Sequence, residues 1–202
     1  MPNPVPDLLL GAWKRTSIVY EDGSSDTDSI VVWLQLESAM VDVRIPAEMD
    51  DPLACEASTG HTTCTPVETG LDGIRRATAE WHTRGPRDIA IHPVSAFPEP
   101  GLLEWNEDGS VMIERAPSGA YVEEWHRLPG STERLAEHQV DIGNRIYLAG
   151  DLAVVVTDTR CETQSPFDVE FAICEPDASN KYWQIVASTL PGRIGEGISV
   201  NI

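Results

Sequence analysis

The sequence predicts an all-β protein folded as a single antiparallel β-barrel of about eight to ten strands, with little helix. Short segments rich in β-branched and aromatic residues recur along the chain, and Gly, Pro, Asn and Asp separate them. Several segments carry polar residues on both faces, which favours a barrel with a polar interior over a sandwich with an apolar core. Closure would also hide the sheet edges that so few helices could cover.

The first half of the chain holds the clearest strands. Residues 11–20 (GAWKRTSIVY) end in the turn-forming EDGS, and residues 29–37 and 39–45 follow as a hairpin. Polar and aliphatic side chains alternate in residues 39–45 (AMVDVRI), so the two faces of that strand must meet different surroundings. Residues 46–76 break the pattern, and we expect an acidic loop insertion there because Gly, Pro and Thr are frequent and periodicity is weak.

The rest of the chain continues the strand pattern. Expected strands in it are residues 78–84, 102–105, 111–115, 120–128, 145–149, 152–158, 169–174, 182–188 and 198–202. The loop NEDG joins residues 102–105 and 111–115 as a hairpin. Residues 131–139 are the one candidate helix, with Ser131 as its N-cap. A chain of 202 residues that is 41% hydrophobic suits one domain, so residues 1–202 are expected to form a single barrel domain.

Charge and cysteine content limit the partners. With 33 acidic and 14 basic residues, the net charge of −19 argues against binding nucleic acid or an anionic membrane surface. No targeting signal or long apolar run is evident, so a cytoplasmic protein is expected. The cysteines Cys55, Cys64, Cys161 and Cys174 lack the spacing of a zinc or redox motif, so no metal site is expected. We expect buried free thiols rather than two disulfides. The sequence is also compatible with a homodimer.

The alternation of polar and aliphatic residues within the strands predicts which side chains line the barrel interior. If the aliphatic faces pack outward under loops or a partner, the barrel would be lined by Trp33, Gln35, Asp42, Arg44, His82, Arg84, Glu114, Tyr121, Glu123 and Trp125. Aromatic walls with a few charges suit a small aromatic or apolar ligand with one oxygen function. A shift of one position would exchange interior and surface in every strand, so the opposite register, with an ordinary aliphatic core, stays open.

Trp13 carries a family resemblance. It stands in Gly11-Ala12-Trp13, similar to the Gly-x-Trp that opens lipocalin-like (calycin) barrels, and a tryptophan there implies a plug at one barrel end with a late-strand arginine across its ring. The segments WKRTSIVYEDGS, WLQLESAMVDVRIP, EWHTRGPRDI and GLLEWNEDGSVMIERAPSGAYVEEWHRLPG resemble an uncharacterised bacterial family of lipocalin-like proteins. They are more distantly similar to fungal kinase-interacting proteins built from lipocalin-like barrels. The resemblance implies a ligand-sized interior and supplies no catalytic residues.

Two function classes, an enzyme and a carrier, follow from this interior, and the fungal resemblance implies a third, a protein-interaction module. The first is a cofactor-independent lyase, isomerase, dehydratase or cyclase on a small apolar or aromatic molecule, with Glu123 or Glu114 as base and His82 as acid. Arg44 or Arg84 would hold a developing oxyanion. Expected ligand contacts are Trp33, Gln35, Tyr121, Trp125 and His61, the last closing a lid over the mouth unless it is an ordinary surface histidine. The alternatives are a carrier for a small hydrophobic ligand or haem, and a protein-interaction module.

Overall fold

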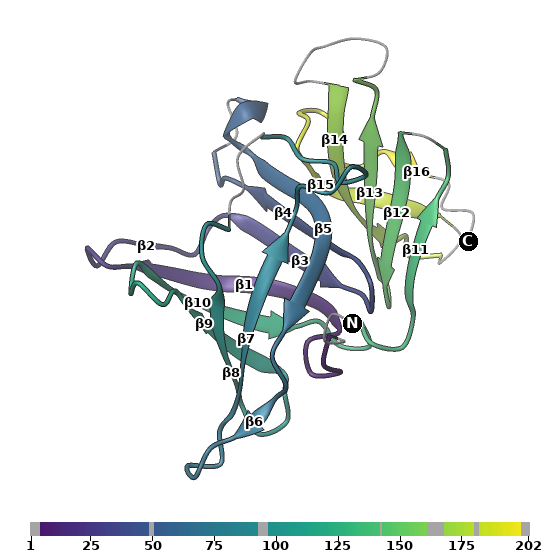
Figure 1. The fold of residues 1–202 in the computed structure, drawn as a ribbon. Coiled ribbons are helices and arrows are strands. Elements are labelled where there is room, and N and C mark those ends of the chain that lie inside the picture. The colour runs from purple at the N-terminus through teal and green to yellow at the C-terminus, as the bar shows by residue number, and fades with distance from the viewer. Residues whose placement is uncertain are drawn as a thin grey trace.

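The strands form two antiparallel sheets that pack against each other. The computed structural model describes residues 5–48, 51–92, 97–141, 143–160, 168–179 and 182–198. Figure 1 shows the first sheet, purple to teal, beside the second, green to yellow. The all-β fold class is confirmed. Among the described residues, no helix is long and apolar enough to cross a membrane.

The first sheet closes into a barrel of eight strands. They are β1 (Gly11–Tyr20), β3 (Ile30–Gln35), β4 (Met40–Ile45), β5 (Glu56–Cys64), β7 (Arg75–His82), β8 (Gly101–Trp105), β9 (Val111–Arg115) and β10 (Tyr121–Arg127). Each pairs with the next along the chain, and β10 pairs with β1 to close the circle. Two short strands also belong to this sheet: β2 (Ser25–Asp26) pairs with β1, and β6 (Glu68–Thr69) pairs with β7.

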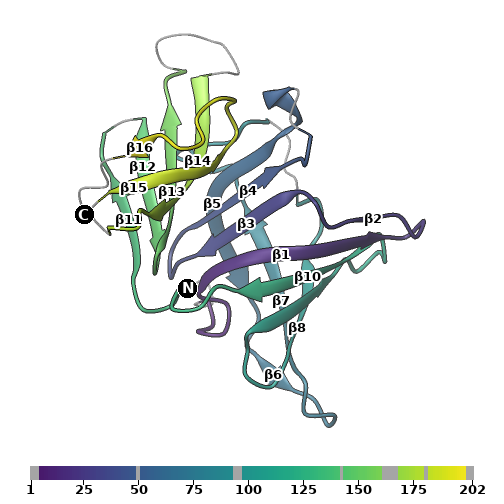
Figure 2. The same ribbon diagram turned by 180° about the vertical axis from the view of Figure 1, so that it is seen from behind.

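The second sheet lies outside the barrel. It contains β11 (Leu135–Gln139), β12 (Asn144–Ala149), β13 (Leu152–Asp158), β14 (Val169–Pro176), β15 (Trp183–Ser188) and β16 (Gly197–Ile198) in chain order. Figure 2 shows this sheet standing at one side of the barrel, next to β3, β4 and β5. The strands of the last third were expected to complete the barrel wall, and they form this separate layer instead. Residues 199–202 of the expected last strand lie outside the described residues.

Aliphatic side chains join the two sheets. The outward faces of β3 and β4 present Val32, Leu34, Val41 and Val43, all buried. They pack in one cluster with side chains of β12, β13 and β14, which include Phe171. Burial of this apolar surface gives the main driving force for docking the sheets. The aliphatic faces therefore do point out of the barrel, and the cover is another part of the same chain.

Two local predictions are wrong. Residues 46–76 are not a loop, because a short 3₁₀ turn (η1, Pro52–Ala54), β5, β6 and the start of β7 lie within them. The sequence of β5, EASTGHTTC, is rich in Thr and small residues, so it lacks the hydrophobic alternation that would mark a strand. Residues 131–139 form no helix; they include β11, which pairs with β12 along its whole length.

Cys55, Cys64 and Cys174 are buried, and no disulfide joins any two of them. Cys55 belongs to the cluster between the sheets, whereas Cys64 belongs to the cluster inside the barrel. Because these clusters lie on opposite sides of the wall, the two thiols cannot meet in a disulfide. Cys161 lies outside the described residues.

Candidate functional site

Two arginines, the buried Arg15 and the partly exposed Arg44, organise a charged cluster inside the barrel. From β1, the Arg15 guanidinium donates to Glu123 Oε1 at 2.9 Å and to Asp26 Oδ2 at 2.8 Å. From β4, Arg44 Nε donates to Asp42 Oδ1 at 2.8 Å, and Arg44 Nη1 lies 3.5 Å from Glu123 Oε1. Glu123 therefore links both arginines. Such charges are stable in a dry interior only when they are paired and hydrogen-bonded.

Among the described residues of this cluster, Glu114 is the carboxyl group that has no arginine within ion-pair distance. It lies on β9 directly opposite Glu123 of β10, and it is 2% exposed. Burial, followed by the nearby charge of Glu123, raises the pKa of Glu114 to about 8. The Tyr121 hydroxyl donates to Glu114 Oε1 at 2.9 Å. Glu114 is thus a buried acid that exchanges its proton near neutral pH.

Burial in the same low-polarity surroundings also shifts the pKa values of Asp42 and Arg44. Burial raises the pKa of Asp42, although Arg44 opposes that effect. For Arg44, burial lowers the pKa, but the charges of Asp42 and Glu123 outweigh it and the pKa is raised. Arg44 therefore stays a cation at every physiological pH.

A glycine brings Glu114 and Trp81 close together. Gly101 begins β8 on the inner face, and a Cβ there would lie 2.4 Å from the Trp81 ring and 3.1 Å from Glu114 Cγ. Any larger residue at this position would displace one of them. The missing side chain lets an indole and a carboxyl group share the space in front of the strand.

Indole rings make up most of the remaining interior. Trp33 lies edge-on to Trp81 and to Trp125, with ring centroids 5.8 and 5.9 Å apart. Phe97 stacks on Trp81 at 5.3 Å and lies under the Arg44 guanidinium at 5.1 Å. This aromatic group is continuous with the charged cluster at Arg44.

Three interior indole N–H groups have no acceptor among the described residues. They belong to Trp33, Trp105 and Trp125, each at most 3% exposed. Buried polar groups are hydrogen-bonded in the great majority of cases, because an unmet donor costs about 1–3 kcal/mol. The interior therefore offers donors that the protein does not itself use.

One end of the barrel is closed by Trp13. Its indole N–H donates to the Leu9 carbonyl at 2.8 Å, and the Arg127 guanidinium lies 4.7 Å above its ring. A late-strand arginine across this ring is the arrangement implied by the Gly-x-Trp resemblance. Cation–π attraction and the buried ring seal this end against water.

The charged cluster lies toward the other end, which is more open. The Arg44 side chain is 19% exposed, and Tyr121 is half-buried. Two surface depressions of about 270 and 330 Å³ adjoin this end, and Trp81 and Phe97 line both of them. Since Trp81 also belongs to the interior cluster, these depressions reach the edge of the barrel interior.

Of the five residues predicted to be catalytic and the five predicted to contact the ligand, seven lie inside the barrel, as does Asp42 of the predicted lining. The seven are Arg44, Glu114, Glu123, Tyr121, Trp33, Trp125 and Gln35. Gln35 accepts a hydrogen bond from Thr62 of β5 at 2.6 Å and does not contact the charged cluster in the described contacts.

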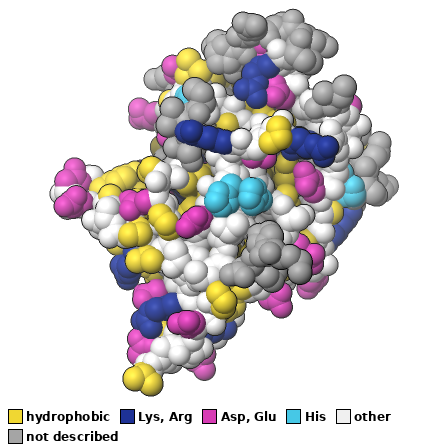
Figure 3. Space-filling model, viewed as in Figure 1, with side chains coloured by type: hydrophobic (Ala, Val, Ile, Leu, Met, Phe, Trp, Pro, Cys, Tyr) yellow, Lys and Arg dark blue, Asp and Glu magenta, His cyan; other side chains and the backbone are white. Residues whose placement is uncertain are grey.

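His82, Arg84 and His61 were placed wrongly. On β7 the buried side chains are Ala77, Ala79 and Trp81, so His82 points out of the barrel. His82 and His61 stack at 4.7 Å on the outer surface, where Figure 3 shows histidines side by side. Arg84 is exposed and follows β7, at the rim of one depression.

The sequence reasoning also missed interior residues. Arg15 stands two positions after Trp13 on β1, and this spacing indicated that both share a face. The Ala77, Ala79 and Trp81 alternation likewise indicated that Trp81 points inward. Among the described residues, no group of three or more His, Cys, Asp or Glu side chains is placed to hold a metal ion.

No protein-family model matches the chain, and no curated protein sequence matches it. The solved structure of an uncharacterised protein from Saccharomyces cerevisiae is similar, with a TM-score of 0.59 and 12% sequence identity. That similarity covers 93% of this chain and 86% of the yeast chain, so it includes both sheets. At this identity the likeness shows the fold alone.

Proposed function

We propose that the protein is a cofactor-independent enzyme with a lipocalin-like barrel, in which Glu114 moves a proton on a small aromatic molecule that carries an oxygen function. The observation that supports this most is the position of Glu114, buried among indoles with Tyr121 donating to it. An acid–base catalyst works best when its pKa is near the operating pH, and the pKa of Glu114 is raised to about 8. Both of its protonation states are then populated near neutrality.

The neighbouring groups suit the rest of such a reaction. Arg44 is a permanent cation, partly exposed at the open end, and it would stabilise negative charge that develops on a substrate oxygen. The rings of Trp33, Trp81 and Phe97 would hold a flat aromatic body, because aromatic pairs favour offset or edge contacts. The reaction class is proton transfer next to a carbonyl or enol, as in isomerases and lyases.

A carrier without catalysis is the second candidate. The three unpartnered indole N–H groups favour it, because donors of this kind fit acceptor atoms of a bound ligand as well as those of a substrate. The two candidates share one binding site and differ only in whether Glu114 transfers a proton.

The test uses proton exchange on aryl ketones. A panel headed by acetophenone is incubated with the protein in D₂O at pD near 7.5, and NMR follows deuterium entry beside the carbonyl. The wild type and a Glu124→Gln control should catalyse exchange, since Glu124 lies on β10 next to Glu123 but faces outward. Glu114→Gln should lose it at least 100-fold, as expected for a general base. Deuterium exchange by Glu114→Gln at the wild-type rate would contradict the proposal. If the ketone quenches the tryptophan fluorescence of the protein but no exchange occurs, the carrier is favoured.

A further inference from the structure

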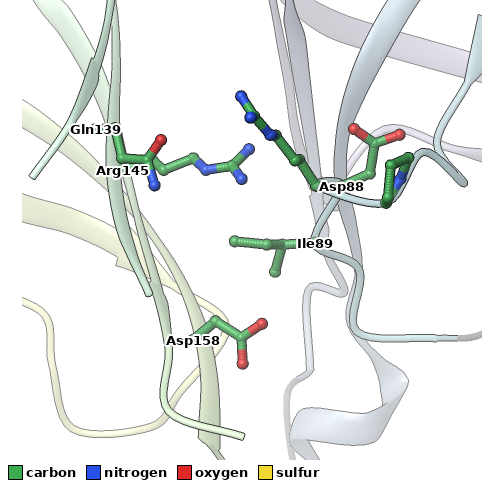
Figure 4. A pocket seen from close by; sticks show the side chains of 7 residues that line it. Asp88, Ile89, Gln139, Arg145 and Asp158 are labelled. Atoms are coloured by element: carbon green, nitrogen blue, oxygen red, sulfur yellow. The ribbon is translucent and has the colours of Figure 1, made fainter. Parts of the chain in front are cut away.

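A second candidate site lies outside the barrel, at one end of the interface between the two sheets. A groove of about 390 Å³ has the loop after β7, with Arg87, Asp88 and Ile89, on one side. Gln139, Arg145 and Asp158 of β11, β12 and β13 form the other side. Figure 4 shows the Arg145 side chain reaching from its strand into this space, toward the wall that carries Asp88 and Ile89.

Arg145 is almost buried and poorly paired. Its side chain is 11% exposed, and its Nε has no acceptor among the described residues. Its contacts are a long hydrogen bond to the Tyr147 hydroxyl, at 3.5 Å, and the Glu137 carboxylate at 4.0 Å. A buried guanidinium without a close carboxylate is costly. Its poor pairing is unexpected in a chain with 33 acidic residues.

Arg87 adds a second available cation on the facing wall. It is exposed, and no ion pair or hydrogen bond of its side chain is found within the described part of the chain. Arg145 belongs to β12 of the second sheet and Arg87 to the loop after β7 of the barrel, so the groove exists only when the two sheets are docked. Together they offer donors in the planar arrangement that matches carboxylate and phosphate oxygens.

The two carboxylates of the groove are already engaged. Asp158 receives two hydrogen bonds from the Arg160 guanidinium, at 2.9 and 2.7 Å, and this contact chiefly lowers the pKa of Asp158. Asp88 accepts from the backbone N–H of Gly85. Neither carboxylate makes a close ion pair with Arg145 or Arg87. The donors of the groove that lack a close carboxylate in the described contacts therefore belong to the two guanidinium groups.

We propose that this groove binds a small oxyanion, a carboxylate or a phosphate group, between Arg145 and Arg87. The anion would supply the acceptors that Arg145 lacks and would link the second sheet to the β7–β8 loop of the barrel. This site is independent of the barrel interior, because Arg145 lies on the outer side of the wall.

Isothermal titration calorimetry with inorganic phosphate and with succinate, at constant ionic strength, tests the proposal. One of the two anions should bind saturably, and the tighter one identifies the oxyanion class. Arg87→Ala and Arg145→Gln should each weaken binding at least tenfold. The control Arg134→Ala, an exposed arginine outside the groove, should bind as the wild type does.

Circular dichroism checks the folding of each variant. If Arg145→Gln fails to fold, Arg87→Ala decides the matter, because Arg87 is exposed and its loss removes no described contact. Absence of saturable binding for both anions would overturn the proposal. Wild-type affinity in the folded variants would also overturn it.

Discussion

The two faces of β3 and β4 are buried to a similar extent but in opposite surroundings. Outward, Val32, Leu34, Val41 and Val43 pack against the second sheet. Inward, the same strands present Trp33, Asp42 and Arg44 to indoles and to other charges. The outer core has the apolar composition that stabilises a fold, whereas the inner one holds ion pairs that give little net stability. The outer side of the wall is therefore apolar, whereas the inner side combines a buried indole cluster with the charges on which the proposed function depends.

The largest expected effect lies in the outer core. Phe171 is fully buried there, and Phe171→Ala should lower the free energy of unfolding by about 3–5 kcal/mol through lost burial and a cavity. Urea denaturation measures this change. Tyr182→Ala, at a 63% exposed position, is the control and should change stability by less than about 0.5 kcal/mol. Equal losses in both variants would remove the distinction between core and surface on which the comparison depends.

The pH dependence of stability tests the inner core. The pKa of Glu114 is raised from 4.5 to about 8 in the folded state, so the native protein holds a proton that the unfolded chain releases in this range. Stability should therefore fall as pH rises from about 4.5 to about 8, by at most about 1.4 kcal/mol per pH unit from this group. Urea midpoints across this range should fall less steeply for Glu114→Gln. An identical slope in both proteins would show that Glu114 does not hold its proton.

Glu123 is the link between the two arginines. Glu123→Gln should destabilise the protein by about 1.5–3 kcal/mol, a value limited by the carboxylates of Asp26 and Asp42 that each arginine keeps. Thermal or urea unfolding measures it against Glu124→Gln, the outward neighbour. A loss no greater than that of the control would mean that the buried network adds nothing to stability.

The closed end should show the smallest effect. Arg127→Met removes the cation over the Trp13 ring and a hydrogen bond to the Leu8 carbonyl but keeps an apolar stem, so we expect a loss of about 0.5–2 kcal/mol. Arg115→Met, whose side chain is 47% exposed, serves as the control in thermal unfolding. Unchanged stability in Arg127→Met would show that the plug depends on Trp13 alone.

Sequence patterns identified the inward-facing residues correctly in strands that follow a clear turn. The NEDG turn and the alternation after it place Glu114, Tyr121, Glu123 and Trp125 on one face, and all four lie inside the barrel. The same reasoning failed on β7. The prediction was out of register by one residue there, so it placed His82 inside the barrel, whereas the structure places Trp81 there.

The second sheet had a signal that was not used. Consecutive residues are buried in both strands, five of six in β12 and four of seven in β13, and their sequences, NRIYLA and LAVVVTD, are apolar at most of these positions. Such runs indicate a sheet covered on both sides, unlike the alternating strands of the barrel. Arg145 could not be placed by this pattern, because its position beside the β7–β8 loop depends on how the two sheets dock.

Indole NMR tests most directly whether the barrel interior receives a ligand. ¹⁵N-labelled protein is titrated with the aryl ketone that quenches its fluorescence most. The indole N–H signals of Trp33, Trp105 and Trp125 should move downfield as they gain an acceptor, while that of Trp13, already bonded to Leu9, stays in place. Shifts confined to Trp183 of the second sheet, or no shifts at saturating ketone, would contradict a binding site within the barrel.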